Sequence, residues 1–148
     1  MVRAARRNSY ASTNQEHLAR FAIADLFLDT LPYNAHTLAS DALWGGCPVL
    51  TCTGRAFPGR VAGSLLRAVG LPELTTHSLA DYEALALQLA RDPLRLRAIR
   101  DKLQANRLTT ALFDSQRFTR HLESAFETMW RMHLGGESLR PFRVAPID

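Results

Sequence analysis

Hydrophobic and polar residues fall into blocks along the first half of the chain, and the spacing within each block predicts its structure. Leu18 and Phe21 recur at helical spacing behind Asn14, a residue type that caps helices. Asp25 and Asp29 bound a short apolar run, which is typical of a strand buried on both faces. The elements predicted here are a helix over 14–22, a strand over 25–29, a turn over 31–34, a helix from His36 or Thr37 to Trp44, a strand over 48–51 and a helix over 59–69.

Helices therefore separate the predicted strands. Gly45 and Gly46 supply a stop for the helix that ends at Trp44, and Pro48 cannot continue it. Short connections that pass from strand to helix to strand favour parallel pairing through right-handed crossovers. We predict an α/β fold in which helices flank a parallel sheet.

The second half of the chain is mainly helical in pattern. Ser78 and Asp81 can cap a helix over 81–91, and Asp92-Pro93 begins another. A short strand over 74–76 is possible, and a long amphipathic helix begins at Ser115. Its apolar stripe consists of Phe118, Leu122, Ala125, Phe126, Met129 and Trp130. We expect a loosely ordered lead-in over 1–13, one lobe over 14–135 that includes the long helix, and a tail over 136–148.

Composition limits the class of protein. The chain has 148 residues, of which 47% are hydrophobic, and this is enough for one domain with its own core. Charged residues interrupt every apolar run before it reaches the ~20 residues that a membrane helix needs. The basic start lacks the apolar region of a secretory signal, so we expect a cytoplasmic protein without a membrane partner.

Charge and cysteine content argue against two kinds of site. The net charge is +4, but with Arg3, Arg6 and Arg7 set aside, 15 basic residues stand against 14 acidic ones. Because these charges are interspersed, the sequence disfavours a nucleic-acid partner. Cys47 and Cys52 are the only cysteines and have no nearby histidine set, so we expect buried reduced thiols and no metal site.

The candidate chemistry lies where the first predicted strand leads into the next helix. A helix start exposes N–H groups and the positive end of the helix dipole, so His36 and Thr37 would stand at a natural seat for phosphate. Asp41 lies one turn deeper on the face of Thr37, where its carboxylate could accept hydrogen bonds from ribose hydroxyls. The simpler alternative is that His36 and Thr37 only begin the helix and that Asp41 is solvated.

His17 and Arg20 form a second candidate pair. They are three residues apart on the first helix and share a face, so the imidazole could stack on a planar base while the guanidinium bonds a carbonyl. Exposed His and Arg side chains are common on helices, so the simpler alternative is that both side chains only contact solvent.

Several segments together resemble the C-terminal part of the O-linked N-acetylglucosamine transferases, the SPINDLY-like group. The resemblance spans about Gln15 to Met132. It is carried by QEHLAR at 15–20, ADLFLDT at 24–30, YNAHT at 33–37, SDALW at 40–44, GCPVLT at 46–51, and by Gly54, Arg60-Val61-Ala62, Ser64-Leu65-Leu66, Gly70-Leu71 and Glu73-Leu74.

This resemblance implies a Rossmann-like lobe, the C-terminal half of a two-domain GT-B glycosyltransferase that binds a UDP-sugar. It places His17 against uracil, Arg20 near its polar edge, His36 and Thr37 at the pyrophosphate, and Asp41 on the ribose. Members of the family transfer N-acetylglucosamine from UDP-GlcNAc to Ser or Thr of an acceptor protein, without a metal ion or other cofactor. Tetratricopeptide repeats commonly precede their catalytic part.

The chain also departs from the family pattern. Leu38 stands where the family usually has a second Thr after His-Thr, and Lys102, the only lysine, lies too late to serve as the family's pyrophosphate lysine. The family's N-terminal catalytic lobe and repeats have no counterpart in these residues, so we assign no catalytic residue. Two alternatives stay open: a folded but inactive remnant without ligand, and an Arg-rich binding module.

Overall fold

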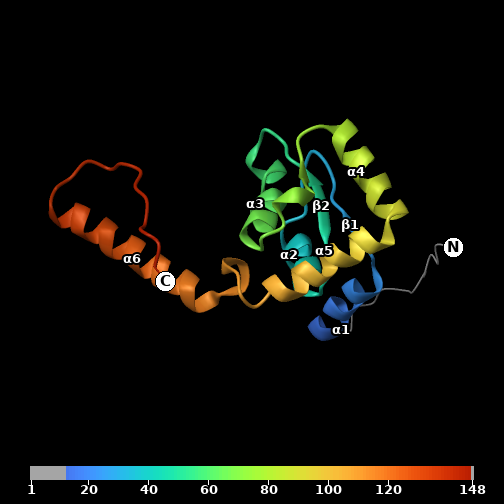
Figure 1. Ribbon diagram of the computed structural model, residues 1–148. Helices are drawn as coiled ribbons and strands as arrows, with labels where there is room; N and C mark the ends of the chain where they lie inside the picture. Colours follow the sequence, from blue (N-terminus) through green and yellow to red (C-terminus); the bar gives the residue numbers. More distant parts are fainter. Residues whose placement is uncertain (1–12, 148) are drawn as a thin grey trace.

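Three short strands form a parallel sheet in the computed structural model, which describes residues 13–147 (Figure 1). They are β1 (Phe27–Leu28), β2 (Val49–Cys52) and β3 (Thr75–Thr76), in the order β1-β2-β3. β2 lies in the centre, pairs with β1 and β3 in parallel, and is buried along its whole length. The prediction of a parallel sheet with flanking helices is confirmed.

The strand predicted over 25–29 is only partly correct. β1 has two residues, and Leu28 is 54% exposed, so the strand is not buried on both faces. The reason is its place in the sheet: among the described residues β1 has a neighbour on one side only. The acid that follows it, Asp29, is instead 95% buried, with 5% of its surface exposed.

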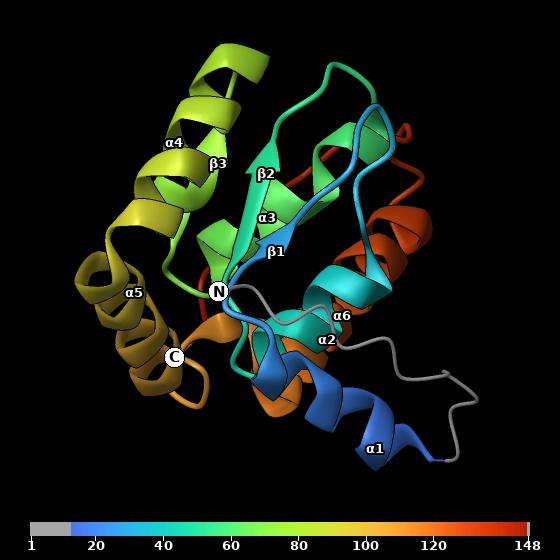
Figure 2. The ribbon, with the colours of Figure 1, turned by 90° about the vertical axis from the view of Figure 1, so that its right-hand side faces the viewer.

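Helices cover both faces of the sheet (Figure 2). α2 (Thr37–Trp44) and α3 (Val61–Ala68) pack on one face, and α4 (Leu79–Arg91) packs on the other with α5 (Pro93–Asn106) beside it. Large buried side chains from both layers meet the sheet and form the core; they include Leu43, Val49, Leu50, Leu66, Leu74, Leu89 and Leu103.

Local capping explains where several helices begin. The Ser78 hydroxyl accepts from Asp81 N at 3.1 Å and starts α4, and the Asp92 carboxylate accepts from Arg95 N at 3.0 Å and starts α5. α1 (Asn14–Ala19) is capped by Thr13 rather than by Asn14, because the Thr13 hydroxyl accepts from Glu16 N. Short 3₁₀ turns complete the path: η1 (Arg20–Ile23), η2 (Phe57–Gly59), η3 (Pro72–Leu74) and η4 (Ala111–Phe113).

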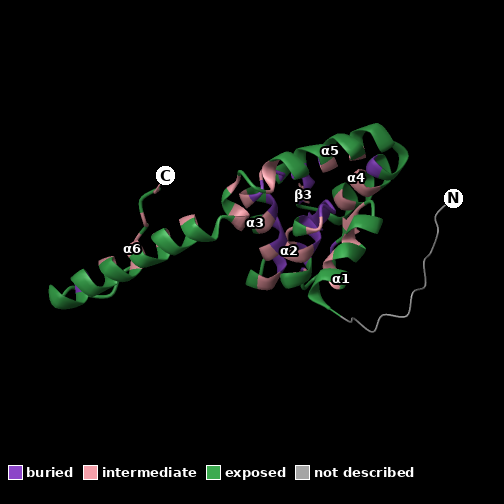
Figure 3. Ribbon diagram, turned by 90° about the horizontal axis from the view of Figure 1, so that it is seen from below, coloured by how far each residue is buried: buried purple, intermediate pink, exposed green. Residues whose placement is uncertain are grey.

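The last helix, α6 (Ser115–Leu134), extends away from the sheet and its covering helices (Figures 1 and 3). Most of its predicted apolar stripe faces solvent: Phe118 is 66%, Phe126 58% and Trp130 60% exposed. Residues 137–147 contain no helix or strand. The lead-in predicted over 1–13 lies outside the described residues except for Thr13. Of the helices described, none has the length and apolar character needed to span a membrane.

Candidate functional site

The N-terminus of α2 lies just beyond the carboxyl end of β1, at the edge where α/β sheets commonly bind ligands. His36 occupies the N-cap position and makes no capping hydrogen bond with its side chain. Thr37, the first helical residue, is exposed. The first turn therefore keeps N–H groups that no capping side chain satisfies, and the helix dipole adds positive potential at the same point.

The ring of His36 is held from several sides. Tyr33 stacks on it, with ring centroids 4.8 Å apart and planes inclined by 22°, and Phe57 meets it edge-on at 6.2 Å. Nε2 of His36 lies 3.3 Å from the carbonyl oxygen of Pro58. Because a carbonyl can only accept, this contact places the proton on Nε2 and leaves Nδ1 for another partner. The loops that follow β1 and β2 thus meet at His36.

Two of the predicted residues, His17 and Asp41, lie side by side. Nε2 of His17 is 3.5 Å from Oδ2 of Asp41, an ion pair when the imidazole is protonated. Both side chains keep about 30% of their surface exposed, at 30% and 28%. Asp41 lies one turn after Thr37 on α2, and His17 reaches it from α1. The structure thereby lines up His36, Thr37, Asp41 and His17 along one helix and its neighbour.

Arg20 makes no side-chain polar contact with this group among residues 13–147. It begins η1 and is exposed. The backbone keeps the predicted relation of the two residues, because Arg20 is helical and its N–H donates to the carbonyl of His17, so the side chains start from the same face. Leu38, the residue that departs from the family pattern, is 49% exposed in the first turn of α2.

The sequence analysis did not identify Asp29 as a site residue, yet its carboxylate is hydrogen-bonded to the loop that leads into α2. Its buried Oδ1 accepts from the N–H groups of Thr30 at 2.9 Å and Ala35 at 2.7 Å. Its Oδ2 accepts from the hydroxyl of Thr51 at 2.6 Å. The only signal in the sequence was an acidic residue at the end of an apolar strand. Its hydrogen-bond partners could not be found from local spacing, because they lie up to 22 residues away in the chain.

A large open hollow lies elsewhere. It has a volume of about 920 Å³ and runs between β1 and the helices α4 and α5, lined by residues such as Leu28, Leu89, Arg97 and Arg100. None of the five predicted site residues lines it. A ligand at the N-terminus of α2 would therefore bind on an outer surface of this part of the chain rather than in that hollow.

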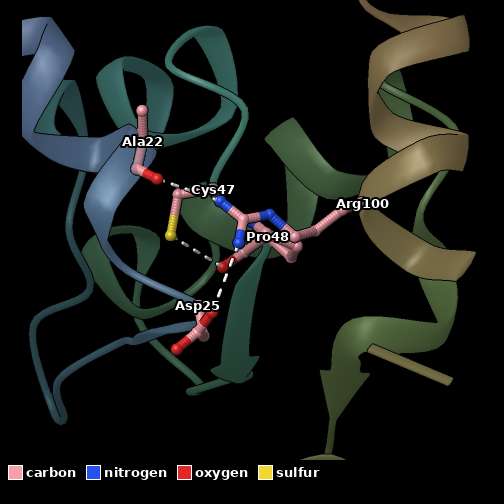
Figure 4. Close-up of polar contacts among 5 residues, drawn as sticks. All are labelled: Ala22, Asp25, Cys47, Pro48 and Arg100. Atoms are coloured by element: carbon pink, nitrogen blue, oxygen red, sulfur yellow. Dashed lines mark hydrogen bonds and ion pairs between the residues drawn. The ribbon is translucent and has the colours of Figure 1, made fainter. Parts of the chain in front are cut away.

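Cys47, which lies two residues before β2, is close to Pro48 and to the Arg100 side chain (Figure 4). Cys47 is fully buried, and its thiol donates to the carbonyl of Pro48 at 3.7 Å. Burial raises its pKa to about 11, against a weaker lowering effect of Arg100. Arg100 itself ties α5 to the chain before β1 through Asp25 Oδ1 at 3.3 Å and Ala22 O at 3.4 Å. At neutral pH the thiol is protonated, so it is neither a nucleophile nor a metal ligand.

The prediction of buried, reduced thiols agrees with the structure: Cys47 and Cys52 are free and buried. Within residues 13–147 there is no group of three or more His, Cys, Asp or Glu side chains that could hold a metal ion.

Comparison with known proteins identifies a family that this chain matches. The family described as Glycosyl transferase family 41 matches residues 7–122. The probable UDP-N-acetylglucosamine–peptide N-acetylglucosaminyltransferase SEC of Arabidopsis thaliana is 40% identical over 134 residues, which are 90% of this chain and 14% of that protein. The corresponding SPINDLY protein of Oryza sativa is 36% identical over 125 residues, which are 84% of this chain and 14% of that protein.

A solved structure is similar as well. A mutant O-GlcNAc transferase of Thermobaculum terrenum superposes with a TM-score of 0.75 at 39% identity, over 80% of this chain and 23% of that one. The chain thus spans only a small part, 14%, of the length of both curated relatives.

Proposed function

The chain belongs to glycosyl transferase family 41, as its resemblance predicted, and on that premise we propose that it is the nucleotide-sugar-binding part of a protein O-GlcNAc transferase. Its donor would be UDP-GlcNAc, and the acceptor a Ser or Thr hydroxyl of a protein. The observation that carries the proposal is the uncapped N-terminus of α2, with His36 held in place and Asp41 one turn away.

The diphosphate of the donor would lie at the first turn of α2. The backbone N–H groups there and the Thr37 hydroxyl can donate to phosphate oxygens, and the helix dipole favours the negative charge. The His36 ring borders the same site, and its Nδ1 can donate to phosphate only when the ring carries a second proton. Leu38 offers only its backbone N–H at this point. A lost hydrogen bond to a charged group costs about 1.5–3 kcal/mol, so donor affinity would be about 10- to 150-fold lower than with a hydroxyl at this position.

The nucleoside would lie further along α2. Asp41 can accept from ribose hydroxyls through the oxygen that does not face His17, and its contact with His17 would orient the imidazole against the uracil. Arg20 would lie near the polar edge of the base. Its side chain is exposed and starts one helical turn after His17, so it is accessible to a base that lies against the imidazole.

By itself this part of the enzyme should bind the nucleotide weakly and transfer nothing. Transfer requires donor and acceptor to be held together, with compensation for the charge that develops on the leaving diphosphate. The Rossmann-like lobe, placed as the C-terminal half of a GT-B enzyme, supplies only part of that. The exposed stripe of α6 would pack against the remainder of the catalytic part, which in the family follows tetratricopeptide repeats.

Titration calorimetry with UDP tests the proposal. We expect a binding heat that saturates with a Kd no weaker than about 1 mM, equivalent to about 4 kcal/mol of binding free energy. Protein shown to be folded by circular dichroism that gives no heat at millimolar UDP would contradict the proposal and favour the inactive remnant. Steeply salt-dependent retention of DNA, without UDP binding, would favour the Arg-rich binding module.

A variant distinguishes ribose recognition from phosphate recognition. Asp41→Ala should weaken UDP more than it weakens free pyrophosphate, because only UDP carries the ribose hydroxyls that the carboxylate accepts from. Asp101→Ala is the matched control, since it removes the same charge from an exposed position on α5. Equal losses for UDP and pyrophosphate in Asp41→Ala would remove the ribose assignment.

A further inference from the structure

Asp29 is a carboxylate that burial should penalise, because an ion removed from water costs free energy unless its oxygens are hydrogen-bonded. Its exposed fraction is 5%, and no lysine or arginine forms an ion pair with it among the described residues. Three donors replace the lost water: two backbone N–H groups on Oδ1 and one hydroxyl on Oδ2. Such an arrangement stabilises a fixed backbone path around the carboxylate.

The two backbone donors come from opposite ends of one loop. Thr30 is the first residue after Asp29, and Ala35 is the last residue before His36. A single oxygen of Asp29 therefore draws both ends of the 30–35 loop to the same point, at 2.9 Å and 2.7 Å. Asn34 reinforces the loop by donating its side-chain amide to the Thr30 carbonyl at 2.9 Å.

Other elements hold this carboxylate in place. Thr51 reaches its second oxygen from the central strand β2 at 2.6 Å, and the Tyr82 hydroxyl donates to the backbone carbonyl of Asp29 from α4 at 2.9 Å. The loop also meets the segment after β2, because Asn34 N donates to the Pro58 carbonyl at 3.1 Å. The position of His36 is thus set by the centre of the sheet through Asp29 and Ala35.

We propose that Asp29 is a positioning residue for the donor diphosphate: its buried carboxylate clamps the 30–35 loop and so fixes His36 and the first turn of α2 where phosphate binds. The inference rests on the proposed nucleotide-sugar site and adds to it the residue that shapes the phosphate seat. Asp29 does not touch the ligand. It acts only through the backbone of Ala35 and His36.

The experiment compares UDP with uridine, which lacks the diphosphate, by NMR titration of the wild-type chain and its variants. Asp29→Ala removes the clamp and should weaken UDP at least 10-fold while changing uridine less than about 3-fold. Asp29→Asn keeps an oxygen for the two backbone N–H groups and should restore most of the UDP affinity. Asp25→Ala is the matched control, because it removes a carboxylate from the other end of β1, where it contacts Arg100 and not the 30–35 loop, and it should leave UDP affinity unchanged.

Each outcome decides the inference. Equal losses of UDP and uridine in Asp29→Ala, or unchanged UDP affinity in the folded variant, would overturn it. If Asp29→Ala does not fold, Thr51→Val removes one carboxylate partner at nearly constant volume, and it should lower the ratio of UDP to uridine affinity; an unchanged ratio would overturn the inference. Wild-type protein that binds neither ligand would refute the proposed function itself, which a failure of the Asp29 variants alone does not.

Discussion

At the scale of single residues, the structure distinguishes exposed side chains that can contact a ligand, such as Thr37, from buried side chains that hold the backbone in place, such as Asp29. Spacing alone predicted that Thr37 and Asp41 share a face of α2, because helix geometry is local. The partners of Asp29 could not be predicted in this way, since Thr51 lies 22 residues away and meets it only when β1 pairs with β2. His17 was predicted to face a base, and its contact with Asp41 depends on how α1 packs against α2.

Cys47 leads to a prediction about alkaline pH. Burial raises the pKa of its thiol from 9.0 in the unfolded chain to about 11 in the folded one, so the folded state holds its proton more tightly. This contribution to stability is complete below pH 9 and is lost as the pH rises to about 11. Urea unfolding of wild-type protein should show a fall in stability across this range that is smaller in Cys47→Ala. Identical pH profiles for the two proteins would contradict the prediction.

At the scale of elements, capping was predictable where the cap and its donor lie within one turn. Ser78 before α4 and Asp92 before α5 were identified from sequence because an N-cap bond joins residues three apart. The cap of α1 was placed one residue too late, since both Thr13 and Asn14 are capping types and the pattern does not choose between them. The length of β1 was overestimated, because the number of residues that form strand hydrogen bonds depends on the neighbouring strand.

Ser78→Ala should lower the free energy of unfolding by about 1 kcal/mol, because it leaves the N–H of Asp81 without its cap. The matched control is Ser64→Ala, at an exposed position inside α3, where alanine is the better helix former and the change should be near zero. Urea midpoints at constant m-value measure both changes. A Ser78→Ala variant as stable as the Ser64→Ala control would show that the α4 cap contributes nothing.

At the scale of the whole molecule, the apolar residues of α6 are mostly exposed, whereas many of those in the preceding part, residues 13–113, which we call the body, are buried. Leu66 is fully buried between α3 and the sheet, whereas Phe118 and Phe126 face solvent on α6. The amphipathic pattern predicted the helix and its stripe correctly, but a stripe does not specify what it packs against. Figure 3 shows the consequence, a helix that is exposed along most of its length.

Substitutions on α6 should therefore leave the body almost unaffected. Phe118→Ser and Phe126→Ser should each change the free energy of unfolding by less than about 0.5 kcal/mol, as expected of surface positions. Leu66→Ala, the buried comparison, should cost about 2–5 kcal/mol. Denaturation at two protein concentrations measures these values. A large and concentration-dependent cost for the α6 variants would mean that the stripe is buried between copies of the chain.

The sequence by itself determined the alternation of helices and strands, most helix starts, the burial of the cysteines and the family, because these depend on local spacing and on residue identity in order. Only the tertiary structure decided which groups meet: Asp29 with Thr51, His17 with Asp41, and the loops after β1 and β2 at His36. The physical reason is that such contacts join residues far apart in the chain, and their geometry exists only after parallel strands and crossover helices have packed together.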